Sequence, residues 1–157
     1  PMKTSTFGFG QMIKDAISKG ARKFIIGIGG SATNDAGIGM LSALGFKFYD
    51  KNDSLLEGKG EDLAQICDFS DEEALKELKE CEFLIACDVD NPLYGQKGAA
   101  YVYAPQKGAN GRMVKQLDDG LKHFAGLVKE RWRANLLCSP NLYQTSRSFL
   151  SLQAVLV

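Results

Sequence analysis

The sequence predicts an α/β fold in which a largely parallel sheet is flanked by helices. Helical stripes of apolar residues alternate along the chain with short apolar runs, which is the pattern of α/β domains. The first of these runs, residues 24–28, lacks polar alternation, as expected of a strand buried on both faces of a parallel sheet. The chain also has 17 glycines but only 4 prolines, and glycine is favoured where the backbone turns sharply or approaches a ligand closely.

The first part of the chain predicts a helix followed by a strand. Apolar residues at three- and four-residue steps place one stripe on a helix that Thr6 caps and Gly20 ends. The residues of this stripe are Phe9, Met12, Ile13, Ala16 and Ile17. A strand over residues 23–28 leads into a glycine-rich segment. The elements expected after that segment are a helix over 38–44 that ends at Gly45, a strand over 46–49 and a loop over 50–60.

The second half predicts further elements of both kinds. Ser70 and Glu73 have the spacing of a capping box, which predicts a helix through Leu78. The elements expected after it are strands over 83–87 and 100–103, the latter ended by Pro105, and an amphipathic helix over 112–129. In residues 131–157 glycine vanishes and no clear period remains, so we expect an α/β region over 1–130 and a divergent, irregular tail over 131–157.

Charge and cysteine usage exclude several classes of function. The 19 basic and 19 acidic side chains balance, whereas nucleic-acid and anionic-membrane binding need clustered positive surface. No run of about 18 apolar residues predicts a membrane span. The 4 cysteines form no CxxC pair and there is 1 histidine, which leaves few ligands for zinc. We therefore expect a cytoplasmic protein that acts on small molecules.

A glycine-rich segment over residues 27–39 is the first candidate site. The backbone N–H groups of Gly29 and Gly30 can converge on an anion, and the positive end of the following helix adds to the attraction. The side chains of Ser31, Thr33 and Asn34 can donate hydrogen bonds to phosphate or hydroxyl groups. The alternative is a tight turn in which these polar side chains only cap a helix.

A dinucleotide-binding loop is a competing interpretation of the same segment. Gly27, Gly29 and Ala32 satisfy the GxGxx[GA] pattern, and Asp50 lies at a suitable distance for a ribose contact. However, the Asp35 carboxylate would repel a pyrophosphate by ~4 kcal/mol at about 4 Å, for an effective dielectric of about 20. Asp35 therefore fits better beside a cation or a substrate hydroxyl.

The second candidate site follows the apolar strand over residues 83–87. Asp88 and Asp90 point to the same side of an extended chain, and Asn91 follows them. This pair can hold Mg²⁺, or one carboxylate can bind the metal while the other accepts a hydroxyl proton. An Asx turn is the alternative. Lys107 lies on a glycine-flanked turn, where it either neutralises a transferred phosphate or faces solvent.

Together these segments resemble the glycerate kinases of the bacterial glycerate-catabolic type. The resemblance is carried by GGSATND at 29–35, GIGM at 37–40, CDVDNPL at 87–93 and APQKGA at 104–109. It covers residues 1–130. Members of that family are much longer, so the resemblance implies an incomplete part of a larger two-domain α/β kinase.

The resemblance implies transfer of the γ-phosphoryl group of ATP to a hydroxyl of D-glycerate, with Mg²⁺ as cofactor. It implies catalytic roles for Asp35, Asp88 and Asp90, of which Asp88 and Asp90 would also hold the metal. The residues implied for phosphate or substrate binding are Gly29, Gly30, Ser31, Thr33, Asn34, Asn91 and Lys107. The alternatives are an NAD(P)-dependent oxidoreductase domain and a kinase fragment that is inactive by itself. Neither nucleic acid nor membrane is an expected partner, and the oligomeric state is not indicated.

Overall fold

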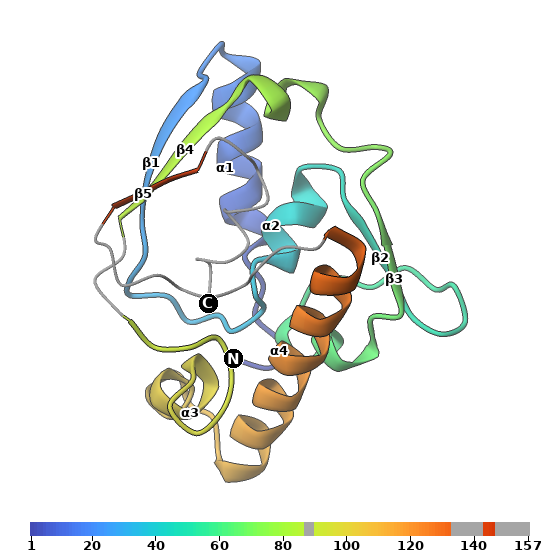
Figure 1. The fold of residues 1–157 in the computed structure, drawn as a ribbon, viewed down its shortest axis with the longest axis vertical. Coiled ribbons are helices and arrows are strands. Elements are labelled where there is room, and N and C mark those ends of the chain that lie inside the picture. The colour runs from blue at the N-terminus through green and yellow to red at the C-terminus, as the bar shows by residue number, and fades with distance from the viewer. Residues whose placement is uncertain (87–89, 133–142, 147–157) are drawn as a thin grey trace.

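The computed structural model describes residues 1–86, 90–132 and 143–146 (Figure 1). Within these residues the helices are α1 (Phe7–Ser18), α2 (Ile38–Ala43), α3 (Ala99–Tyr103) and α4 (Gly111–Trp132). The strands are β1 (Lys23–Gly27), β2 (Lys47–Tyr49), β3 (Asp68–Ser70), β4 (Glu82–Ala86) and β5 (Tyr143–Ser146). Short 3₁₀ helices are η1 (Gly60–Gln65), η2 (Lys76–Glu80) and η3 (Pro105–Lys107). The prediction of an α/β fold is confirmed.

The described strands form two sheets. In the larger sheet the order is β1-β4-β5, and β1 pairs with β4 in parallel, with Ile26 opposite Ile85. Strand β5 pairs with β4 in the antiparallel direction. Strand β2 does not join this sheet, because it pairs with β3 in a separate antiparallel sheet. The parallel pair that the sequence predicts is thus β1 with β4.

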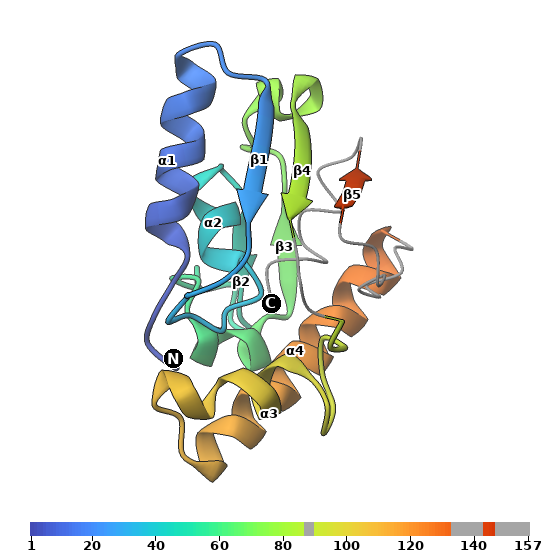
Figure 2. The same ribbon diagram turned by 90° about the vertical axis from the view of Figure 1, so that its left-hand side faces the viewer.

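Helices α1 and α2 lie against one face of the β1–β4 pair (Figures 1 and 2). Ile26 and Ile85 are buried on that face, and the rings of Phe24 and Phe83 stack there with centroids 5.0 Å apart. On the opposite face Ile25 is 78% exposed. The expectation that residues 23–28 are buried on both faces is therefore wrong for the described part of the chain.

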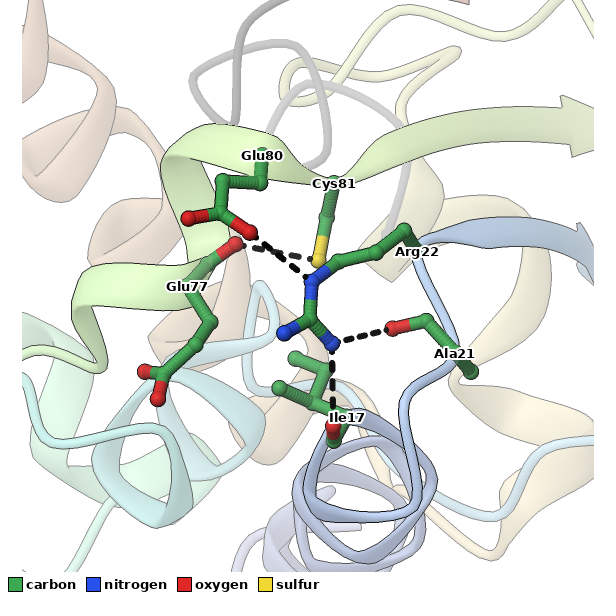
Figure 3. Close-up of polar contacts among 6 residues, drawn as sticks. All are labelled: Ile17, Ala21, Arg22, Glu77, Glu80 and Cys81. Atoms are coloured by element: carbon green, nitrogen blue, oxygen red, sulfur yellow. Dashed lines mark hydrogen bonds and ion pairs between the residues drawn. The ribbon is translucent and has the colours of Figure 1, made fainter.

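A polar cluster fixes the ends at which β1 and β4 begin (Figure 3). The guanidinium of Arg22 donates to the carbonyl oxygens of Ile17 and Ala21, at 3.0 and 2.9 Å, and pairs with Glu80 at 3.1 Å. Beside it the Cys81 thiol donates to the carbonyl oxygen of Glu77 at 3.3 Å, and burial raises the pKa of this thiol. The cluster joins the end of α1 to the turn before β4.

Two elements differ from the prediction. Ser70 ends β3 rather than capping an α-helix, and only the 3₁₀ helix η2 follows. Residues 99–103 are the α-helix α3, not a strand, and Pro105 opens η3. The aromatic and β-branched residues of α3 favour a strand locally, but Ala100 and Ala104, which are four residues apart, are both fully buried, and packing decides the outcome.

The long amphipathic helix is confirmed as α4, whose buried residues recur at helical spacing. The residues of this stripe are Val114, Leu117, Leu121, Phe124 and Val128. Helix α1 is also confirmed, with Ile13 and Ile17 buried, although Met12 of the predicted stripe is 69% exposed. No described helix has the length and apolar character needed to cross a membrane.

The start of the chain packs closely on α2. A Cβ added to Gly39 would lie 2.0 Å from the Ser5 hydroxyl oxygen and 2.9 Å from the Gly58 carbonyl oxygen, so no larger residue fits there. The Ser5 hydroxyl in turn donates to that Gly58 carbonyl oxygen at 2.6 Å. These contacts bring residues 4–6 beside the glycine-rich segment.

Candidate anion-binding site

The segment between β1 and α2 presents a row of backbone N–H groups that have no acceptor within the described part of the chain. Among the described residues, none of the N–H groups from residue 29 to residue 33 donates to a protein acceptor. Residues 29–32 are exposed and Thr33 is half-buried. A run of accessible N–H groups on irregular backbone is the arrangement that binds phosphate and carboxylate groups.

Two glycines of this segment are not explained by packing. A Cβ at Gly27 or Gly29 would meet nothing within 4 Å, and neither residue has a left-handed φ. Gly30 also has open space around it, but its φ of 63° favours glycine for conformational reasons. Close approach of a ligand to the backbone would account for glycine at positions 27 and 29.

Lys107 is the last residue of η3, and its side chain contacts this segment. Its ammonium group donates to the Thr33 carbonyl oxygen at 2.6 Å and to the Ser31 hydroxyl oxygen at 3.1 Å. Burial lowers the pKa of Lys107, and the negative charge of Asp35 opposes this shift. The structure therefore brings Lys107, Ser31 and Thr33 together, and adds a cation to the row of N–H groups.

Asp35 is 1% exposed, and its carboxylate accepts hydrogen bonds on both oxygens. Oδ2 accepts from the Thr6 N–H at 2.7 Å, from the Thr6 hydroxyl at 2.8 Å and from the Gly39 N–H at 3.4 Å, whereas Oδ1 accepts from the Gly37 N–H at 3.3 Å. Burial raises the pKa of Asp35, and these hydrogen bonds oppose the shift. In this structure Asp35 joins the beginnings of α1 and α2.

The first N–H groups of α2 are occupied within the protein. The N–H of Ile38 donates to the Asp35 carbonyl oxygen at 3.0 Å, and that of Met40 donates to the Thr6 hydroxyl oxygen at 2.9 Å. The Gly39 N–H is held by the Asp35 carboxylate. The expectation that the positive end of this helix attracts the ligand is therefore wrong, because Asp35 and Thr6 already take these donors.

Asn34 is the buried exception between these satisfied residues. Its side chain is 5% exposed, and neither Nδ2 nor Oδ1 has a hydrogen-bond partner among the described residues. Buried side-chain amides are nearly always paired in native structures, so an unpaired amide calls for an explanation. The sequence predicts substrate contact for Asn34, and both its polar atoms are buried without a partner among the described residues.

The acidic loop after β4 is described only in part. Asp88 lies outside the described residues, and Asp90 is exposed. The Asn91 amide donates to the Lys97 carbonyl oxygen at 3.0 Å and accepts from the Tyr103 hydroxyl at 2.5 Å. Neither contact is an Asx turn, in which the side-chain oxygen accepts from the N–H group two residues on. The meeting of Asp35 with Asp88 and Asp90 stays a prediction.

The described residues do not form a metal site by themselves. They contain no group of three or more His, Cys, Asp or Glu side chains that could hold an ion. Of the two predicted ligands only Asp90 is described. The Mg²⁺ assignment therefore stays a prediction.

The structure does not support the dinucleotide interpretation. Asp50 accepts from the N–H groups of Asn52 and Ser54 at 2.8 and 2.9 Å, so it organises its own turn, and these bonds lower its pKa. In addition, β2 lies in the separate sheet with β3. A ribose-binding carboxylate should instead follow a strand beside the glycine-rich loop.

Sequence reasoning missed the part that the first residues play in this site. The Thr4 hydroxyl donates to the Ala32 carbonyl oxygen at 2.9 Å, and Thr6 binds Asp35. Both partners are nearly thirty residues away along the chain, and no local pattern signals such contacts. Thr6 is predicted only as a helix cap, and its side chain makes no cap hydrogen bond.

Comparison with known proteins gives one consistent result. The family model for the glycerate kinase family matches residues 1–141. A glycerate kinase of Haemophilus influenzae is 45% identical over 129 residues, which are 82% of this chain and 34% of that protein. A glycerate 2-kinase of Escherichia coli is 43% identical over 130 residues, covering 83% of this chain and 34% of that protein.

A solved structure agrees with these sequence relatives. The crystal structure described as that of glycerate kinase 2 from Salmonella typhimurium LT2 matches with a TM-score of 0.84 and 39% identity. The match covers 87% of this chain and 37% of that one. The chain thus spans about a third of the length of the relatives that it matches. The extent of these matches, in sequence and in fold, shows that the chain belongs to the glycerate kinase family.

Proposed function

We propose that this chain supplies the anion-binding part of an ATP-dependent glycerate kinase. The whole protein would transfer the γ-phosphoryl group of ATP to a hydroxyl of D-glycerate. The observation that carries the proposal is the row of N–H groups over residues 29–33, which have no acceptor in the described part of the chain, with the Lys107 ammonium held against Ser31 and Thr33. Phosphoryl transfer depends mainly on positioning and on stabilisation of negative charge, and these are the groups that provide it.

The roles follow from the contacts of each residue. The N–H groups of Gly29 and Gly30 and the Ser31 hydroxyl would bind phosphate oxygens, because they are exposed. Lys107 would balance negative charge on the ligand while anchoring the loop through Thr33. Asp35 would position the segment rather than exchange a proton, since both its oxygens already accept hydrogen bonds.

We assign the proton-accepting and metal-binding roles to Asp88 and Asp90, as the family likeness implies. Their oxygens suit Mg²⁺, and Asp90 is exposed. Asn91 would hold the shape of this loop through Lys97 and Tyr103. The free thiols of Cys67 and Cys81 agree with a reducing, cytoplasmic location.

Titration calorimetry on the chain, combined with an ADP-release assay, tests this function. We expect ADP and ATP to bind in the presence of Mg²⁺, and D-glycerate to bind independently. Glycerate-dependent ADP release would show that the chain is an active kinase. Binding without release would favour the fragment alternative. If neither nucleotide nor D-glycerate binds, the proposed function of this site is wrong.

A further inference from the structure

We infer that Asn34 is a preformed contact for a 2-hydroxy carboxylate, and that it does not contact the nucleotide phosphates. The inference rests on the proposed function and names which of the two substrates this residue recognises. It starts from the unpaired amide, which is 5% exposed and has no partner for Nδ2 or Oδ1 among the described residues.

The residues on either side of Asn34 each have a polar group that is held within the protein. The Thr33 carbonyl oxygen accepts from Lys107 at 2.6 Å, and the Asp35 carboxylate accepts from Thr6, Gly37 and Gly39. The Thr33 carbonyl oxygen and the Asp35 carboxylate are therefore satisfied, whereas the Asn34 amide has no partner among the described residues. A buried amide without a partner calls for an explanation, and a ligand at the candidate site would supply one.

Close packing fixes the backbone at this position. A Cβ added to Gly60 would lie 2.9 Å from the Asn34 carbonyl oxygen and 3.0 Å from a methyl group of Leu117. The carbonyl oxygen of Asn34 thus lies close to Gly60 of η1. Because the backbone is held in this way, we do not expect it to shift so that the Asn34 side-chain amide reaches a partner within the protein.

The chemistry of an amide selects the ligand. Nδ2 needs an acceptor and Oδ1 needs a donor, so a complete partner offers both on neighbouring atoms. Ionised phosphate oxygens are acceptors only, and would leave Oδ1 unpaired. A 2-hydroxy carboxylate satisfies both, since a carboxylate oxygen accepts from Nδ2 and the adjacent hydroxyl donates to Oδ1. The Lys107 ammonium, which contacts the preceding residue, supplies the positive charge that a carboxylate needs.

The variant Asn34→Leu tests the inference, because leucine has a similar shape and no polar group. Without ligand, its melting temperature should equal or exceed that of the wild type, since the variant removes an unpaired buried amide. Asn110→Leu is the matched control. The Asn110 amide oxygen accepts from the Met113 N–H at 3.0 Å, so this variant should melt at a lower temperature.

Ligand binding provides the second measurement. D-glycerate and D-lactate should bind the wild type, whereas propionate, which lacks the hydroxyl, should bind at least about tenfold more weakly. Asn34→Leu should lose D-glycerate affinity by about tenfold or more and keep its affinity for ADP, and Asn110→Leu should keep both.

Three results would overturn the inference. Asn34→Leu could bind D-glycerate as tightly as the wild type does. It could lose as much affinity for ADP as for D-glycerate. It could also melt at a lower temperature than Asn110→Leu, which would show that the Asn34 amide is already paired. In each case nucleotide and D-glycerate binding by the wild type would leave the proposed function standing. If the wild type binds neither ligand, the proposed function and the inference fail together.

Discussion

The ammonium group of Lys107 lies 2.6 Å from the carbonyl oxygen of Thr33, although 74 residues separate them along the chain. The contact ties the turn before α4 to the glycine-rich segment after β1. It also places a cation beside backbone N–H groups that have no acceptor among the described residues. The candidate site is therefore assembled from two distant stretches of sequence.

Replacing Lys107 by methionine should weaken phosphate binding. The variant keeps the length of the side chain and removes the charge that donates to Ser31 and Thr33. A charge-assisted hydrogen bond contributes about 1.5–3 kcal/mol, so ADP affinity should fall by about tenfold or more in calorimetry. Lys97→Met is the control, because Lys97 is exposed and follows the same Gln-Lys-Gly-Ala pattern. Equal losses in both variants would contradict a specific role for Lys107.

The affinity for ADP should also depend on pH through Lys107. Burial lowers the pKa of Lys107 from its ordinary value of 10.5. The ammonium form is present below the pKa and lost above it. The affinity for ADP should therefore start to fall at a lower pH than it would if Lys107 had the ordinary pKa of an exposed lysine. The measurement is ADP affinity between about pH 7 and pH 10, with Lys107→Met as the reference that should show no such decline. A wild-type profile parallel to that of Lys107→Met would argue against this cause.

Asp35→Asn should destabilise the protein, because an amide cannot accept on both of its polar atoms. Leaving a buried N–H unpaired costs about 1–3 kcal/mol. The pKa of Asp35 is raised above 3.8 in the folded protein, so the folded state holds the proton more tightly than the unfolded one. The stability that this group contributes is then present below about pH 3.8 and declines as pH rises towards the folded pKa. Urea unfolding of both proteins from pH 3 to 7 should show that the difference between their free energies of unfolding becomes smaller as pH rises. A difference that grows with pH would contradict the raised pKa of Asp35.

Thr6→Val should remove the hydroxyl that links Asp35 to α2. This hydroxyl donates to Asp35 and accepts from the Met40 N–H, so about 1–3 kcal/mol of stability should be lost. A double-mutant cycle with Asp35→Asn should give a coupling energy of about 0.5–3 kcal/mol. Thr4→Val serves as control, because the Thr4 hydroxyl contacts only carbonyl oxygens among the described residues. Additive losses for Thr6 and Asp35 would mean that the two side chains act independently.

Alanine at Gly39 should lower stability, whereas alanine at Gly29 should lower ADP affinity and leave stability nearly unchanged. The Gly39→Ala methyl group would lie 2.0 Å from the Ser5 hydroxyl oxygen, and such overpacking costs about 1–3 kcal/mol. The methyl group of Gly29→Ala meets nothing within 4 Å, so stability should change by no more than about 0.5 kcal/mol. The same methyl group would obstruct a phosphate at the loop. Chemical unfolding and ADP titration of both variants would show whether each glycine is required by packing or by a ligand that approaches the backbone. Unchanged ADP affinity in Gly29→Ala would mean that ligand approach does not explain the glycine at position 29.

The sequence predicts those features that depend on local patterns. Helices α1, α2 and α4 follow from apolar periodicity and from the glycines that end them, and strands β1 and β4 follow from their apolar runs. Helix α3 is missed because burial of Ala100 and Ala104 outweighs local strand preference. The sequence does not predict that β1 is buried on one face only, because its composition does not show which faces of the strand the helices cover.

The candidate site divides in the same way. Residue types and glycine spacing single out the candidate anion-binding segment, and the glycine-flanked turn singles out Lys107. The inward orientation of Asp35 could not be predicted, because its partner Thr6 lies 29 residues earlier in the chain. Asn34 is singled out by sequence for its hydrogen-bonding capacity, but only the structure shows that its amide has no partner in the part of the chain described.

The parallel pairing of β1 with β4 has a consequence for synthesis on the ribosome. Lys23 pairs with Glu82, so β1 leaves the exit tunnel well before its neighbouring strand has been translated. At roughly 5–20 residues per second, Phe24 and Ile26 stay without the apolar partners Phe83 and Ile85 for several seconds. During this interval the apolar face of β1 is open to contact with other nascent chains, which is the kind of exposure that chaperones cover.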